Sequence, residues 1–320
     1  MREGVAAQVE KMNVESSNPV MKWADSEFNY QWADMKQLLK VGIINSNTMT
    51  AFAGFWVALY FTGSSLSEYW HMLLVTVIGT AFVIAGGCVL NNYFDRDIDN
   101  VMERTKGRPT VTGKIPVSHV IFMGVAFSVV GISILGLASI QTAVIGIIGW
   151  FSYVVLYTLW SKRKYTINTG IGSLSGAIPP LIGWSAVEPS LQPAAYVFFL
   201  LIFIWQTPHF LAIAIRKTED YRAANIPMLP VVHGNEMTRR QMLIYILCLL
   251  PVPFFLYELG TVFMVICTLL NLGWIYLAIT GYKKDVDFKK WANKMFGYSL
   301  LYLTLICIVM IVITLPTNLF

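Results

Sequence analysis

The segment LNNYFDRDIDNVMERTKGRP, from Leu90 to Pro109, follows a long apolar run and carries the densest charge in the chain. If the helix of the apolar run continues through it, Asn91, Asp95 and Asp99 recur every four residues and share one face. Two carboxylates and an amide oxygen suit Mg²⁺, which takes one or two protein carboxylates together with waters and substrate phosphates. The spacing therefore predicts a Mg²⁺ site that also receives an anionic substrate.

Basic side chains follow this stripe directly, at Arg104, Lys106 and Arg108. Arginine and lysine are the residues that bind phosphate groups through charge-assisted hydrogen bonds. An acidic stripe beside a basic loop suits a polyanion that arrives with its metal. The alternative is a solvated helix end held by salt bridges, because loops next to membranes often carry mixed charge.

A second charged segment follows a later apolar run, FLLIFIWQTPHFLAIAI, and contains Arg216, Lys217, Asp220 and Tyr221. Both apolar runs are expected to cross a membrane in the same direction, so both charged ends should reach the same face. We therefore expect the two segments to build one site.

Polar residues also occur inside this second run, where Gln206 and His209 lie about two helical turns before Arg216. An ionisable residue within a membrane helix often marks a functional site. Next to Trp205 and the helix-bending Pro208, His209 is a candidate contact in such a site, and packing remains the alternative.

Composition indicates the elements that must position these residues. The chain is 320 residues long, 56% hydrophobic and 13% charged, and an average soluble domain is about 25% charged. Apolar stretches near the length needed to cross a bilayer predict an all-α, polytopic membrane protein. We count nine spans, at 38–61, 70–94, 117–137, 140–160, 169–187, 194–215, 241–258, 261–281 and 296–316.

The fifth span, TGIGSLSGAIPPLIGW, is the least apolar and holds Pro179 and Pro180. Small residues let helices approach closely, and prolines in membrane helices are tolerated where neighbours satisfy the backbone. We expect a kinked helix packed at the centre of the bundle. The four cysteines lie in apolar stretches without metal-ligand spacing and predict no disulfide.

Basic residues predict the orientation. All 23 Lys and Arg residues lie before or at the start of the first span, or after the second, fourth, sixth and eighth. The positive-inside rule places these loops and the N-terminus in the cytoplasm and the C-terminus outside. We expect a polar cytoplasmic tail over 1–37 and a membrane domain over 38–318, in two similarly oriented halves around a central cavity with the ninth helix added. A bacterial cell (inner) membrane fits this pattern, because the N-terminal segment matches neither a transit nor a signal peptide.

Three separated motifs resemble the UbiA-type intramembrane prenyltransferases and, within that superfamily, the haem O synthase branch. They are NNYFDRDIDNVMERTKGRP, YTLWSKRKYTINTGIGSLSGAIPPLIGW and DYRAANIPMLPVVHG. The resemblance covers approximately residues 38–316. It implies transfer of a farnesyl group from farnesyl diphosphate to the vinyl group of haem B, with addition of water, to give haem O for terminal oxidases.

The resemblance also implies roles for residues. Asn91, Asp95 and Asp99 would bind Mg²⁺ and the prenyl diphosphate, and Asp220 would belong to a second acidic motif whose other acid is replaced by Ala224. The diphosphate clamp would comprise Arg104, Lys106, Arg108, Lys162, Arg163, Arg216 and Lys217. The haem or prenyl cavity would be lined by Tyr157, Trp205, His209 and Tyr221.

The implied partners are farnesyl diphosphate, haem B as a substrate, the lipid bilayer, and haem A synthase or oxidase assembly proteins, with no nucleic acid. Other functions stay open from the sequence. One is a related prenyltransferase with an aromatic or quinone-precursor acceptor. The others are a cation-coupled transporter and a non-catalytic assembly scaffold.

Overall fold

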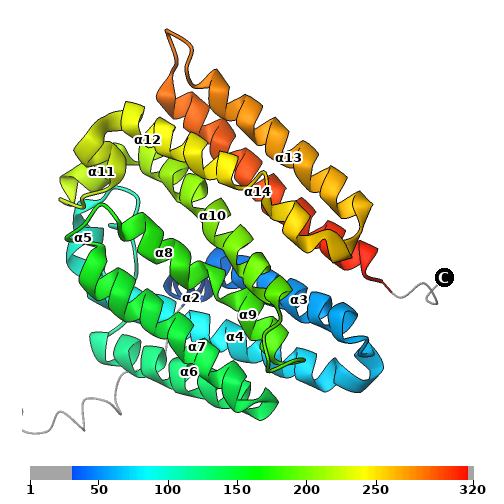
Figure 1. The fold of residues 1–320 in the computed structure, drawn as a ribbon. Helices are drawn as coiled ribbons and strands as arrows, with labels where there is room; N and C mark the ends of the chain where they lie inside the picture. The colour runs from blue at the N-terminus through cyan, green and yellow to red at the C-terminus, as the bar shows by residue number, and fades with distance from the viewer. Residues whose placement is uncertain (1–30, 316–320) are drawn as a thin grey trace, which may run out of the picture.

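The computed structural model describes residues 31–315, and every regular element within that range is a helix (Figure 1). The all-α prediction is confirmed. In chain order the helices are α2 (Trp32–Leu39), α3 (Val41–Thr62), α4 (Leu66–Phe94), α5 (Arg96–Val101), α6 (Val117–Ala138), α7 (Ile140–Phe151), η2 (Ser152–Ser161), α8 (Asn168–Ala177), α9 (Pro179–Ser185), α10 (Pro193–Arg216), α11 (Thr218–Ala223), α12 (Leu229–Cys248), η3 (Val252–Leu259), α13 (Thr261–Thr280) and α14 (Phe288–Ile313).

Seven helical segments of the described chain are long and apolar enough to cross a membrane. They are α4, α6, α7 with η2, α10, α12 with η3, α13 and α14. The other two predicted spans are also helical but do not meet that measure. One is α3, whose first turns carry the polar sequence NSNT, and the other is divided into the short helices α8 and α9.

The predicted fifth span is interrupted as expected, because α8 ends at Ala177 and α9 begins at Pro179. Every residue of α9 is buried. Its backbone touches that of α3: a Cβ atom added at Gly183 would lie 1.9 Å from the carbonyl oxygen of Ala51, and one at Gly54 would lie 2.2 Å from that of Pro180. The predicted central, kinked helix is confirmed, and glycine is what permits this contact.

Each of the two charged segments forms a short helix at the same end of the bundle (Figure 1). The first, α5, follows α4 after a single residue, and α11 follows α10 in the same way. Ile98 and Met102 share an apolar cluster with Ala214, Ile226 and Met228. Because this cluster joins α5 to the chain on both sides of α11, the two charged segments meet as the sequence predicted.

Residues 1–30 of the predicted tail and residues 316–318 of the predicted membrane domain lie outside the described residues. The remaining part of that tail forms most of α2, which packs on α4. Leu38 is buried with Val89, and the Asn92 side chain donates a hydrogen bond of 2.8 Å to the Leu38 carbonyl. The four cysteines are free, as predicted.

Candidate active site

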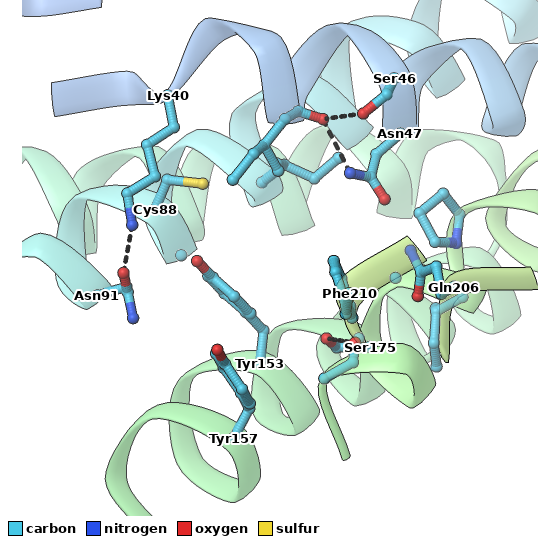
Figure 2. A pocket seen from close by; sticks show the side chains of 18 of the residues that line it. Lys40, Ser46, Asn47, Cys88, Asn91, Tyr153, Tyr157, Ser175, Gln206 and Phe210 are labelled. Carbon is cyan, nitrogen blue, oxygen red and sulfur yellow. Dashed lines mark hydrogen bonds between the residues drawn. The ribbon is translucent and has the colours of Figure 1, made fainter. Parts of the chain in front are cut away.

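A cavity of about 350 Å³ opens among α3, α4, η2, α8, α10 and α14. One end is charged, and Figure 2 shows Lys40 and Asn91 there, with Tyr153 and Tyr157 beside them. Gln206 and Phe210 lie toward the opposite end beside Ser175, where most of the lining is apolar. A pocket of this kind suits a molecule with an anionic head and an apolar tail.

The helix junction keeps the predicted acidic stripe intact. Helix α4 ends at Phe94, but the Asp95 amide still donates to the Asn91 carbonyl at 2.9 Å and the Asp99 amide to the Asp95 carbonyl at 2.8 Å. These bonds preserve the helical register, so Asn91, Asp95 and Asp99 remain on one face. All three line the cavity and are at most 2% exposed.

Each member of the stripe has a basic partner. The Lys40 ammonium donates to the Asn91 amide oxygen, the Lys162 ammonium to Asp95, and the Arg108 guanidinium to Asp99 at 2.5 Å. A buried carboxylate without a partner is costly, so these pairs stabilise the two ionised acids. Lys40 was not among the residues predicted for the site, although it stands at the start of the first predicted span and directly before α3.

Asp95 has a carboxylate oxygen that is free to bind a divalent metal. Asp95 Oδ1 is buried without a hydrogen-bond partner, and the Arg163 guanidinium is 3.9 Å away. Within residues 31–315 no group of three or more His, Cys, Asp or Glu side chains is placed to hold a metal. The set is therefore two carboxylates and one amide, which suits Mg²⁺ if substrate phosphate oxygens complete its coordination.

Only three of the seven residues predicted for the basic clamp line the cavity. Arg104, Arg108 and Lys162 line the cavity. Lys106 and Arg163 do not: Lys106 pairs with Glu103 at the surface, and Arg163 holds Asp97 through two bonds of 2.6 Å. Those bonds lower the pKa of Asp97 below its usual value.

The second charged segment contributes Tyr221 to the cavity wall. Asp220, Arg216 and Lys217 are not part of that wall. The Lys217 ammonium lies 3.9 Å from Asp220, and the Arg216 guanidinium lies over the Phe296 ring at 4.4 Å. Ala224, at the position where the resemblance implies a second acid, packs against the apolar cluster of Ile98 and its neighbours.

Aromatic and polar side chains line the rest of the cavity. Tyr153 and Tyr157 stack with their ring centres 5.9 Å apart. Trp205 stacks on His209 at 5.0 Å, and both line the cavity as predicted. The polar residues Ser46, Asn47 and Thr50 of α3 also line it. Sequence reasoning missed them, although the polar sequence NSNTMT within an apolar span was a usable signal.

A family model described as the UbiA prenyltransferase family matches residues 48–300 of this chain. The chain belongs to the UbiA prenyltransferase family. The matched range contains the acidic stripe, the bases Arg104, Arg108 and Lys162, and almost the whole apolar chamber, but not Lys40. Membership confirms the resemblance seen in the sequence motifs and places the chain among transferases.

The chain is also similar to named bacterial proteins. The chain is 54% identical over 284 residues to Protoheme IX farnesyltransferase 2 of Bacillus velezensis (strain DSM 23117 / BGSC 10A6 / LMG 26770 / FZB42), covering 89% of this chain and 93% of the relative. It is 52% identical, with the same coverage, to Protoheme IX farnesyltransferase 2 of Bacillus subtilis (strain 168). Protoheme IX farnesyltransferase of Geobacillus sp. (strain WCH70) is 51% identical, with 89% and 92% covered.

Solved structures of the family share the fold. A digeranylgeranylglyceryl phosphate synthase superposes with a TM-score of 0.70 at 18% identity, over 88% of this chain and 98% of that chain. A UbiA homologue from Archaeoglobus fulgidus, bound to DMAPP and Mg²⁺, gives a TM-score of 0.63 at 14% identity, over 87% and 99%. At these identities the likeness concerns the fold alone.

Proposed function

We propose that this chain transfers a farnesyl group from farnesyl diphosphate to a vinyl group of haem B, with addition of water, to form haem O. The observation that carries the proposal is more than 50% identity to protohaem IX farnesyltransferases along 89% of the chain. The cavity supports it, because a buried charged end adjoins an apolar chamber. These are the two environments that a prenyl diphosphate requires.

Departure of the diphosphate is the first chemical problem. Lys40, Arg108 and Lys162 would turn from the acidic stripe toward the diphosphate oxygens and stabilise the charge that develops on them. Mg²⁺, held by Asn91, Asp95 and Asp99, would supply further charge neutralisation to the leaving group. The use of a divalent metal is supported by the UbiA homologue from Archaeoglobus fulgidus, whose structures contain Mg²⁺ together with DMAPP or GPP.

The allylic cation must then survive until it meets the acceptor. The stacked rings of Tyr153 and Tyr157 would stabilise it by cation–π attraction, since both line the cavity beside Asp95. The surrounding apolar wall limits entry of water. Tyr221, Trp205 and His209 would border the acceptor. Arg216, Lys217, Lys106 and Arg163 would attract the anionic substrate at the cytoplasmic rim, where Asp220 would position the Lys217 ammonium 3.9 Å away.

The chain would cross a bacterial cell membrane nine times, with α3 and the α8–α9 pair added to the seven apolar segments. The basic loops would face the cytoplasm and the C-terminus the outside. Haem A synthase or oxidase assembly proteins in the same bilayer would receive the product.

Purified protein tests the proposal when it is incubated with haem B, farnesyl diphosphate and Mg²⁺ and the pigments are separated by mass spectrometry. We expect a haem heavier by one farnesyl group and one water. In a parallel incubation, 4-hydroxybenzoate takes the place of haem B as the acceptor. We expect no prenylated product from it. Prenylation of 4-hydroxybenzoate with haem B unchanged would overturn the proposal in favour of an aromatic acceptor.

A further inference from the structure

Gln206 places an unpaired amide in the wall of the apolar chamber. Its side chain is 8% exposed, lines the cavity, and has a buried Oε1 atom without a hydrogen-bond partner. A Cβ atom added at Gly176 would lie 2.1 Å from Nε2 of Gln206, so a glycine on α8 leaves the room that this amide occupies. An unpaired buried amide is costly, which indicates that something absent from the protein itself pairs with it.

His209 presents a second polar atom to the same chamber. The Ser299 hydroxyl donates to the Phe296 carbonyl at 2.6 Å, so it accepts a hydrogen bond from Nδ1 of His209 at 2.7 Å. This contact assigns the ring proton to Nδ1 and leaves the lone pair on Nε2. Within residues 31–315 no protein group pairs with Nε2, and the Trp205 and Phe296 rings hold the imidazole at 5.0 Å each.

The two side chains share one surface of α10. Gln206 and His209 are three residues apart, and residues at this spacing are neighbours on a helix face. Both line the cavity, and Figure 2 shows Gln206 far from the charged end at Asn91. A small molecule between them can donate a hydrogen bond to one acceptor and a proton to the other.

We infer that Gln206 and His209 bind and deprotonate the water that completes the reaction, an inference that rests on the proposed function. The carbon–oxygen bond of farnesyl diphosphate breaks, and its electron pair leaves with the diphosphate. The vinyl π electrons of haem B form the new carbon–carbon bond and leave a cation beside the porphyrin ring. The water oxygen bonds to that cation, and its proton passes to Nε2 of His209. No oxidant or reductant is needed.

The competing fate of the cation supplies the test. Without a held water, the cation loses a proton and gives a farnesylated haem that is lighter by one water. We expect Gln206→Met, which keeps the volume but removes the amide, to raise the dehydrated fraction of product at least tenfold. Ser299→Ala should raise it as well, because it frees the imidazole but keeps both water-binding side chains. Ile202→Val, an apolar change in the same wall, is the control and should leave the fraction unchanged.

The product ratio also separates this inference from the proposed function. If the unaltered protein makes no farnesylated haem, the proposed function fails. If it makes haem O and the variants give the same hydrated fraction, only the assignment of the water site is overturned. Should Gln206→Met yield no farnesylated haem at all, the ratio from Ser299→Ala decides, since an unchanged ratio there also overturns the assignment.

Discussion

Two aspartates that are two positions apart occupy opposite environments. Asp95 is 1% exposed and bonds to Lys162 inside the cavity, whereas the Asp97 side chain is 66% exposed and pairs with Arg163. The first pair stabilises a buried charge, where electrostatic interactions are stronger than at the surface. The second is a surface ion pair, and such pairs contribute little.

This contrast predicts the effects of two matched substitutions. Asp95→Asn should lower the rate of haem farnesylation by ~100-fold or more, because it removes a charge that we propose binds the metal at the departing diphosphate. Asp97→Asn should change the rate by less than about twofold. Initial rates of product formation, measured with equal amounts of folded protein, check both. Equal losses in the two variants would contradict the proposed role of the stripe.

At the scale of elements, the site depends on close contact between α3 and α9. Lys40 stands immediately before α3, and Asn47 and Thr50 line the cavity from that helix. The position of α3 is set by Gly54 and Gly183, where the two backbones touch. Dispersion contacts of this kind stabilise helix pairs in a membrane, because lipid removes the hydrophobic driving force between them.

Gly183→Ala should therefore destabilise the protein by roughly 1–3 kcal/mol, because the new methyl group would clash with the Ala51 carbonyl. Gly297→Ala is the matched control. It lies within α14, a Cβ atom there meets nothing within 4 Å, and the change should be neutral or stabilising by about 0.4–1 kcal/mol. Thermal unfolding in detergent compares the two. Equal stability of the Gly183→Ala and Gly297→Ala proteins would contradict the proposed dependence on close contact between α3 and α9.

At the scale of the whole molecule, charged segments gather at one end of an otherwise apolar bundle. α5 and α11 lie together there, and the loop after α5 carries Arg104, Lys106 and Arg108 (Figure 1). The loops at the opposite end, such as the one containing Ser190, hold no Lys or Arg. This asymmetry predicts that water-soluble substrate approaches from the cytoplasm and that the apolar acceptor enters from the bilayer.

Cysteine accessibility tests this orientation. In a background with Cys248→Ser, a cysteine at Ser190 should react with a membrane-impermeant maleimide in intact cells. A cysteine at Thr112, in the loop between α5 and α6, should react only after the membrane is opened. Both positions are exposed, so burial does not account for a difference between them. Labelling of Thr112→Cys in intact cells would reverse the predicted orientation.

The sequence by itself determined the all-helical membrane architecture, the break at Pro179 and the register of the acidic stripe. These features depend on local properties. A segment within lipid must form its backbone hydrogen bonds internally, and helical spacing places every fourth residue on one face. Only the tertiary structure decided which bases enter the cavity. Lys40 reaches Asn91 across 51 positions and Lys162 reaches Asp95 across 67, whereas Lys106 and Arg163 pair outside it. Such contacts arise from helix packing, which the local pattern of residues does not specify.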